Sequence, residues 1–300
     1  MRAPRAKAVL AAAVLSLTLA ACGSDDEEGG GTDTAAPSEE AAAEFEAGSR
    51  MAELQEAGKI TIGTKFDQPL FGLKGLSGDP EGFDVEVAKL IAAELGIPAD
   101  GIEFVETVSA NREPFLEQGQ VDLVAATYTI NDKRDEVIDF AGPYFVAGQD
   151  ILVAAGNPEG IEGEDDLAGK TVCSVAGSTP AGYIEENVPD ATLVLFDTYT
   201  KCRDALAAGT DGVVAVTTDN VILAGYADQD PTKFELVDAP FTEEPYGIGV
   251  PEGQEAFCEF INESLAKFEE DGSLQEAYDK TAGTVIEQEL TLPTPRGCDS

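Results

Sequence analysis

Two stretches of the sequence repeat one local pattern, and this repeat limits the folds that the chain can adopt. The first is LEQGQVDLVAAT at residues 116–127, and the second is LAAGTDGVVAVT at residues 206–217. In each, a helical segment ends at a glycine, an aspartate follows, and a nearly continuous apolar strand ends at a threonine. Such strands are typical of a parallel sheet that helices cover on both faces. The repeat therefore predicts two similar α/β lobes, each a mainly parallel sheet flanked by helices.

The segments around the repeat alternate between strand and helix patterns. Strands are expected at residues 59–64, 102–107, 121–127, 150–155, 171–177, 192–196 and 213–217. Helices are expected at residues 83–96, 111–119, 180–187, 201–209, 220–226, 253–271 and 273–281. The stretch EPYGIGV at 244–250 has no sheet partner nearby in the sequence, so we expect it to return to the first lobe. Lobe 1 is then residues 58–149 with 246–300, lobe 2 is residues 150–245, and the two crossings form a hinge.

The N-terminus has the features of an export signal. Basic residues precede an apolar run from Val9 to Ala21, which is shorter than the about 20 residues of a membrane span. Cys22 follows directly after Leu-Ala-Ala, which resembles a bacterial lipobox. We expect a signal peptide at 1–21, a lipidated Cys22 and a disordered acidic tether at 22–57, at the extracellular face of the cell membrane. The alternative is ordinary secretion, with Cys22 removed or unmodified.

Charge and histidine content exclude several classes of function. The chain has 58 acidic against 18 basic residues, a formal net charge of −40. Nucleic acid is therefore not expected as a partner, because phosphate binding needs a basic patch. The sequence contains no histidine, which rules out Ser-His and Cys-His catalysis and argues against a zinc site. We expect neither a metal nor a cofactor.

Four cysteines remain beyond the lipobox, and an even number in an exported chain indicates two disulfides. Four cysteines allow three sets of pairs. We favour Cys173–Cys202, because both lie in the middle of the chain, and Cys258–Cys298, which would tie the C-terminal tail to a late helix.

Ligands of open α/β sheets bind beyond the carboxyl ends of the strands, and this rule selects candidate residues. They are Lys65, Ser109 to Arg112, Thr127 to Arg134, Gly177 to Thr179, and Thr217 to Asp219. Thr127 and Thr129 alternate along one strand end, and Arg134 follows in the next turn. Two hydroxyls and a guanidinium suit a carboxylate ligand. The alternative is that NDKRDE is a solvated run of charges.

The other candidates each have a second interpretation. Ser178 or Thr179 would cap a short helix, either alone or while that helix end also binds an anion. Asp219 is either a helix N-cap or an acceptor for an ammonium group. Arg112 lies at a helix start, where the dipole disfavours a cation, which indicates another role. Lys65 either faces the site or pairs with an acid at the lobe surface, Asp67 or Glu81.

Four stretches in order carry a resemblance to a known family: EGFDVEVAKLIAAELG, VDLVAATYTINDKRDEVIDFAGPYF, AGST and VTTDNVILAGY. They resemble the polar amino-acid-binding proteins of ABC importers, which are family 3 solute-binding proteins with a two-lobed type II periplasmic-binding (Venus flytrap) fold. The resemblance covers about residues 58–285, and IGTKFDQPLFG is similar to the start of glutamate-binding lipoproteins of high-GC Gram-positive bacteria.

The resemblance implies a set of ligand-binding residues. Arg134, Thr127, Thr129 and the turn at Ser178 and Thr179 would hold the α-carboxylate, Asp219 the α-ammonium, and Lys65, Ser109 and Arg112 the side chain of the ligand. Gln68 stands where other members have an aromatic residue over the ligand. Two cations beside an amino-acid clamp imply an acidic ligand.

The expected function follows from this set. The chain would bind L-glutamate, or else L-aspartate, by hinge closure, and would deliver it as a monomer to the membrane subunits of an ABC permease. Glutamine is the next alternative, and a ligand-sensing subunit of a membrane signalling system is an alternative role. A secreted dehydratase-type enzyme on this fold is less favoured, since catalysis needs a tuned acid or base. The chain is therefore not expected to be an enzyme.

Overall fold

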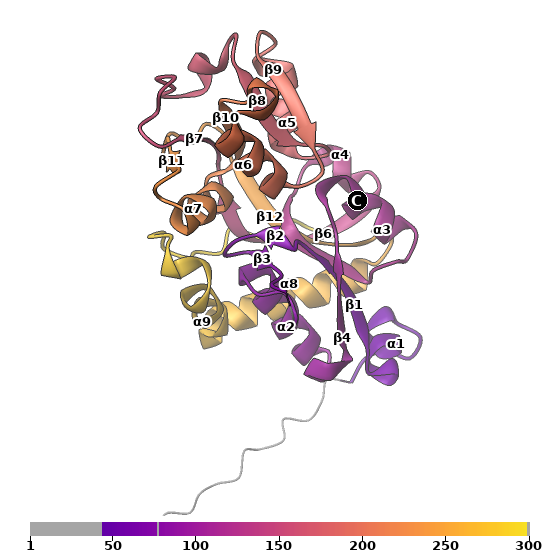
Figure 1. Ribbon diagram of the computed structural model, residues 1–300. Helices are drawn as coiled ribbons and strands as arrows, with labels where there is room; N and C mark the ends of the chain where they lie inside the picture. The colour runs from indigo at the N-terminus through magenta and orange to yellow at the C-terminus, as the bar shows by residue number, and fades with distance from the viewer. Residues whose placement is uncertain (1–43, 77, 299–300) are drawn as a thin grey trace, which may run out of the picture. The chain divides into compact units, whose positions relative to one another are not determined.

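The structure is a computed structural model that describes residues 44–76 and 78–298 (Figure 1). The predicted signal peptide, Cys22 and the tether up to residue 43 lie outside the described residues. The described part of the chain contains two five-stranded sheets and one two-stranded sheet, together with helices. Among its helices, none combines the length and the apolar character needed to cross a bilayer.

The first sheet is built from both ends of the described chain. Its order is β4 (Ile102–Glu106), β1 (Ile60–Thr64), β5 (Leu123–Thr129), β12 (Glu244–Pro251) and β6 (Ile138–Ala147). Strand β1 is parallel to β4 and β5, whereas β12 is antiparallel to β5 and β6. The EPYGIGV stretch thus joins this sheet, as expected from its lack of nearby partners. The sheet is mixed rather than mainly parallel.

The second sheet is continuous in the sequence. Its order is β11 (Phe234–Leu236), β7 (Gln149–Ala154), β10 (Ala215–Asp219), β8 (Thr171–Val175) and β9 (Thr192–Phe196). The strands β10, β8 and β9 run parallel, and β7 is antiparallel to both of its neighbours. The parallel half of each sheet contains the repeated apolar strands, β5 and β10. This sheet is also mixed, and its division from the first at residues 150 and 245 stays a prediction.

Helices cover both sheets, and their buried faces follow the 3.6-residue period. They are α1 (Arg50–Ala57), α2 (Phe83–Glu94), α3 (Arg112–Glu117), α4 (Asp132–Asp135), α5 (Thr179–Asn187), α6 (Tyr199–Ala208), α7 (Asn220–Gln229), α8 (Glu255–Asp271) and α9 (Ser273–Lys280). In α8, Phe257, Ile261 and Leu265 are buried, and Gly272 ends the helix with a left-handed φ of 82°. Helices α8 and α9 pack on α2, far away in the sequence (Figure 1).

The structure corrects two sequence-based expectations. Residues 50–57 are the helix α1 and not the end of a disordered tether, because Met51 and Leu54 are buried in the core and Ser49 caps the helix. Strand β6 was not predicted. It contains Pro143 and the charged Asp139, which interrupt the sequence pattern of a strand. The sheet tolerates Pro143 because β6 lies at its edge.

A very short hairpin follows β1. Strands β2 (Asp67–Gln68) and β3 (Gly72–Leu73) pair with each other and bring residues 65–73 back toward the first sheet. Both favoured disulfides are present, Cys173–Cys202 and Cys258–Cys298. The first joins β8 to α6, and the second joins α8 to the C-terminal tail.

Candidate functional site

Most of the predicted residues surround one small cavity. It is lined by Ser109, Arg112, Thr127, Thr129, Ser178, Thr179, Pro180, Tyr199, Asp219 and Ile222. Ser109 and Arg112 follow β4, and Thr127 and Thr129 end β5. Ser178 to Pro180 follow β8, Tyr199 follows β9, and Asp219 ends β10 with Ile222 following it, as the rule for open sheets requires. Lys65 and Arg134 do not line the cavity, but each binds a residue that does.

Lys65 is buried among other cations. It directly follows β1, its side chain is 3% exposed, and its Nζ donates a hydrogen bond to Ser109 Oγ at 2.8 Å. Burial and the nearby charge of Arg112 lower the pKa of Lys65 to about 7. Neither alternative partner forms an ion pair with Lys65 within the described part of the chain: the Asp67 carboxylate accepts N–H groups of α6, and Glu81 is exposed whereas Lys65 is buried. Lys65 reaches the cavity through Ser109, and its contact with a ligand stays a prediction.

Arg112 uses its guanidinium to clamp backbone carbonyls. Its Nη1 donates to Ala126 O at 3.2 Å and Thr127 O at 3.1 Å, and its Nη2 donates to Gly177 O at 3.3 Å. The guanidinium also stacks on the Tyr128 ring, 4.3 Å from its centroid. These contacts join the first sheet to the turn after β8, which is the further role that its place at a helix start indicated.

Arg134 also lies over the Tyr128 ring, 5.1 Å from its centroid. Its Nη1 donates to Thr129 O at 2.6 Å, its Nη2 to Gly177 O at 3.1 Å, and its Nε to Glu113 Oε1 at 3.1 Å. Burial and Arg112 lower the pKa of Arg134 to about 10, so it stays charged at neutral pH. The solvated-run interpretation of NDKRDE is wrong for Arg134, which is buried, although its neighbours Asp132 and Lys133 are exposed.

Thr127 has a backbone conformation that a β-branched residue rarely adopts. Its φ is 43°, which costs on the order of 1–3 kcal/mol. Asp84 holds this conformation: its Oδ2 accepts the Thr127 N–H at 2.7 Å, and its Oδ1 accepts the Tyr144 hydroxyl at 2.6 Å. Burial raises the pKa of Asp84 to about 7. Sequence reasoning missed Asp84, although an acid next to Phe83 on the apolar face of α2 was a signal.

The turn after β8 approaches the first sheet closely. Gly177 has a φ of 78°, and a Cβ there would lie 2.8 Å from the Cα of Ala110. The helix-cap interpretation holds for Ser178, whose Oγ accepts the Ala181 N–H at 3.1 Å. Thr179 instead directs its hydroxyl to Glu244 Oε2 at 2.6 Å. Only glycine fits at position 177 without a shift of the backbone.

Asp219 ends β10 as a buried carboxylate. It occupies the N-cap position of α7 but makes no capping hydrogen bond, so the helix-cap interpretation is wrong. Its Oδ2 accepts the Tyr246 hydroxyl at 2.5 Å, and its Oδ1 has no hydrogen-bond partner within the described part of the chain. Burial and the charge of Glu244 raise the pKa of Asp219 to about 8. An ammonium group would satisfy this oxygen and this charge.

Glu244 is a further site residue that sequence reasoning missed. It opens β12, is 4% exposed, and accepts hydroxyls from Thr129 at 2.7 Å and Thr242 at 2.9 Å as well as from Thr179. The only sequence signal was an acid at the start of the returning EPYGIGV strand. With Glu113, it places two resident carboxylates close to the buried cations.

The cavity itself has a volume of about 10 Å³, which is room for one water molecule. An amino acid can enter only if the two sides of the cavity move apart. A larger hollow of about 390 Å³ lies on the second sheet's side, lined by Glu164, Tyr183 and Asp190 among others. None of the predicted site residues lines it. The small cavity is the better candidate because buried polar groups with shifted pKa values converge there.

The sequence matches a known protein family over most of its length. The family model of bacterial extracellular solute-binding proteins, family 3, matches residues 60–284. The ABC transporter glutamine-binding protein GlnH of Bacillus subtilis is 39% identical over 280 residues, which cover 91% of this chain and 97% of that relative. The glutamate-binding protein GluB of Corynebacterium efficiens is 38% identical over 288 residues, which cover 93% of this chain and 90% of that relative.

A solved structure has the same fold. The solute receptor for L-cysteine of Neisseria gonorrhoeae matches with a TM-score of 0.75 and 33% identity, and the match covers 81% of this chain and 99% of that one. The predicted class, a two-lobed type II periplasmic-binding fold, is confirmed, with mixed sheets in place of mainly parallel ones.

Proposed function

Since the chain belongs to the bacterial extracellular solute-binding proteins of family 3, we propose that it captures an acidic amino acid by hinge closure and delivers it to an ABC permease. At the coarser level, it is an extracellular amino-acid-binding protein of an ABC importer. L-Glutamate is the proposed ligand, with L-aspartate as its close rival, because one methylene changes affinity by only about 1–3 kcal/mol. The relatives are named for binding, which accords with a protein that is not an enzyme.

The observation that carries the acidic ligand is the pair of buried cations, Lys65 and Arg112. Burial disfavours the charged form of Lys65 strongly enough to lower its pKa to about 7, and Arg112 adds to that effect. A side-chain carboxylate beside Lys65 and Ser109 would reverse both effects. Hydrogen bonds to charged groups contribute about 1.5–3 kcal/mol each, so contacts of the ligand's second carboxylate with these groups would increase its affinity.

The groups around the cavity fit the α-carbon substituents of an amino acid. We assign the α-carboxylate to Arg134 and to the hydroxyls of Thr127, Thr129, Ser178 and Thr179. The α-ammonium is assigned to Asp219, whose Oδ1 is buried without a partner among the described residues. Lobe 1 (58–149 with 246–300) would hold the carboxylates first, and lobe 2 (150–245) would add the turn at Ser178 and Thr179 and the carboxylate of Asp219 as it closes.

Glutamine is the second candidate, and a specific observation favours it. Glu113 binds Arg134, and Glu244 lies among the hydroxyls of the proposed carboxylate site. These two carboxylates offset part of the charge of the three cations Lys65, Arg112 and Arg134, which leaves less need for a second ligand charge. The relative GlnH is named as a glutamine-binding protein.

The remaining parts of the proposal concern anchoring and partners. A lipid on Cys22 would hold the protein at the outer membrane surface, and the acidic segment after it would keep the folded part away from anionic lipid. We propose that a monomer docks on the permease in its closed form. A membrane signalling protein is the alternative partner.

Calorimetric titration with L-glutamate, L-aspartate, L-glutamine, L-asparagine and L-arginine tests the ligand class. The decisive variant is Lys65→Met, which keeps the apolar stem but removes the charge. We expect it to weaken glutamate by about tenfold or more and glutamine by less than about threefold. The exposed Lys59→Met is the matched control and should change neither affinity.

Two outcomes would contradict the proposal. Tightest binding of arginine by the unmodified protein would reject an acidic ligand. Equal losses of glutamate and glutamine affinity in Lys65→Met would remove Lys65 from the side-chain pocket, and glutamine would then be the better assignment.

A further inference from the structure

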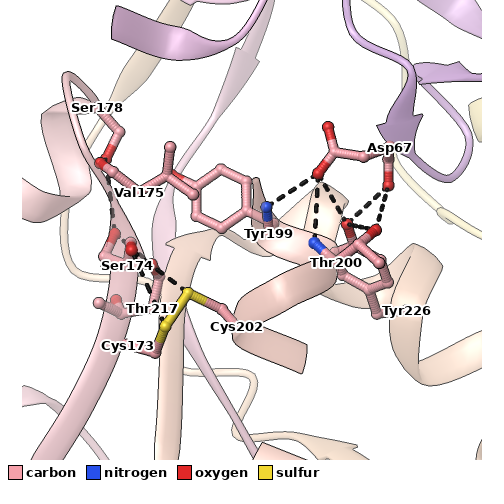
Figure 2. The surroundings of a disulfide bond; sticks show 10 residues. All are labelled: Asp67, Cys173, Ser174, Val175, Ser178, Tyr199, Thr200, Cys202, Thr217 and Tyr226. Carbon is pink, nitrogen blue, oxygen red and sulfur yellow. Dashed lines mark hydrogen bonds between the residues drawn. A yellow bond between two sulfur atoms is a disulfide. The ribbon is translucent and has the colours of Figure 1, made fainter. Parts of the chain in front are cut away.

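Asp67 of the β2–β3 hairpin contacts the second half of the chain through both its side chain and its backbone (Figure 2). Its Oδ2 accepts the backbone N–H groups of Tyr199 at 2.9 Å and Thr200 at 3.3 Å. Its carbonyl oxygen accepts the hydroxyls of Tyr226 at 2.7 Å and Thr200 at 3.2 Å. Four donors from α6 and α7 thus meet one residue of the opposite half.

These bonds supply a cap that α6 lacks in its own sequence segment. The first N–H groups of a helix have no partner within the helix, and a side chain of the preceding residue normally binds them. Thr198 occupies that position in α6 but makes no capping hydrogen bond. Asp67 lies 132 residues before Tyr199, and its carboxylate caps α6 instead. The negative charge of this carboxylate also interacts favourably with the helix dipole.

The same hairpin contributes to the proposed binding site. Lys65, two residues before Asp67, binds Ser109, and the next residue, Gln68, accepts the Thr127 hydroxyl at 3.0 Å. On the other side, the Tyr199 side chain lines the cavity while its backbone N–H binds Asp67. Helix α6 is also fixed to the second sheet by the Cys173–Cys202 disulfide (Figure 2). Site and cap therefore share the same two short segments.

The packing beside the cap is equally close. A Cβ on Gly225 of α7 would lie 2.9 Å from the Cβ of Pro69 and 3.0 Å from its carbonyl oxygen. Pro69 and Gly225 therefore touch with no room for a side chain between them. All of these contacts join residues 67–70 to α6 and α7, so they exist only while the two halves are together.

We infer that Asp67 is a positioning residue that holds the protein closed by capping α6 across the cleft, and that it thereby sets the rate at which bound amino acid is released. This inference rests on the proposed closure around an amino acid. In the open form, water replaces Asp67 at the end of α6, so Asp67 contributes to the closed form alone. Its loss should raise the dissociation rate and leave the association rate almost unchanged.

The experiment compares three variants of the protein in a chase assay with radiolabelled L-glutamate and L-glutamine. Asp67→Ala removes the cap, and loss of an N-cap corresponds to a change of about tenfold in an equilibrium constant. We therefore expect dissociation to be about tenfold faster. Asp67→Asn keeps an acceptor oxygen, and its rate should return to within about threefold of the unmodified protein. Asp79→Ala, at an exposed acid of the same half, is the matched control.

The melting temperature of the ligand-free protein separates this role from a structural one. Asp67→Ala should melt close to the unmodified protein, while its bound form loses stabilisation by ligand. An unchanged dissociation rate in Asp67→Ala would overturn the inference, as would a loss of ligand-free stability that Asp67→Asn does not restore. If the unmodified protein bound neither labelled amino acid nor any other, the proposed function itself would fail, which is a different outcome.

Discussion

At the residue scale, Lys65 concentrates the unusual electrostatics of the site. It is buried beside Arg112 and Arg134, and the acids whose charges partly offset this effect on Lys65 are Asp67 and Asp84. Asp84 has a pKa raised to about 7 by burial, so it offsets the cations only in part at neutral pH. Burial disfavours the charged form of Lys65, and an anionic ligand beside it would favour that form. The number of protons taken up on binding therefore depends on the charge of the ligand.

Glutamate binding should therefore take up more protons near pH 8 than glutamine binding does. A ligand carboxylate stabilises the charged form of Lys65 and raises its pKa from about 7, so a proton binds with the ligand. Affinity for glutamate relative to glutamine should fall as the pH rises from about 7 to 9, and this contribution of Lys65 should vanish below about pH 6, where Lys65 is already charged. Calorimetry in buffers of different ionisation heat measures the uptake.

Glutamine is the internal control for this measurement. Burial raises the pKa of Asp219 to about 8 in the absence of ligand, and the α-ammonium of either ligand should lower this pKa and release a proton. Both ligands carry the same α-ammonium, so this release is the same for glutamate and glutamine. The difference between the two ligands thus isolates Lys65. Lys65→Arg, which keeps a charge that does not titrate, should abolish the difference, and its persistence there would show that another group takes up the proton.

At the element scale, the two disulfides have different consequences. Cys173–Cys202 fixes α6, the helix that meets Asp67 and lines the cavity with Tyr199. Cys258–Cys298 fixes a tail that has no helix or strand after Thr284 in the described residues. Loops of 29 and 40 residues constrain the unfolded chain to a similar extent, by about 3–4 kcal/mol each.

Replacing each cysteine pair by serines should separate stability from binding. Both double variants should lose about 3 kcal/mol of unfolding free energy in denaturant titrations. Cys173→Ser with Cys202→Ser should also weaken amino-acid binding, because α6 is then free to shift. Cys258→Ser with Cys298→Ser should bind as the unmodified protein does. Equal affinities in the two variants would show that the Cys173–Cys202 disulfide, and the position of α6 that it fixes, does not affect ligand binding.

At the scale of the whole molecule, the site consists of two sets of residues that must meet. Gly177 O accepts hydrogen bonds from Arg112 and Arg134, and Gly177 itself touches Ala110. The cavity of about 10 Å³ between these two sets of residues is too small for an amino acid. Binding therefore requires the two sets to move apart and then close again.

Gly177→Ala should therefore weaken ligand binding by about tenfold or more, since its Cβ would lie 2.8 Å from the Ala110 backbone and prevent full closure. Gly156→Ala is the matched control: its φ of 79° is nearly the same, but nothing lies within 4 Å of its Cβ. Both variants carry the same backbone strain, and calorimetric affinities compare them. Similar affinities would mean that closure does not bring position 177 against Ala110.

Much of this architecture was readable in the sequence because it depends on local patterns. The repeated apolar strands became β5 and β10, and the polar residues at the ends of the strands met at one cavity. Parallel strands carry their ends to the same edge wherever they pair, so Thr127 and Asp219 were identified without knowledge of the packing. The alternation of strands and helices likewise indicated the two sheets, although not their antiparallel strands.

The rest depended on contacts between distant segments, which no local pattern encodes. Asp84 supports Thr127 from α2, Glu244 joins the hydroxyls of Thr129 in β5 and Thr179 in α5, and Asp67 caps a helix in the opposite half. The helix α1 forms for the same kind of reason, since a short helix gains its stability from the core on which Met51 and Leu54 pack. A residue's type limits the bonds it can make, but the partner that satisfies them is chosen when the chain folds and buries both groups away from water.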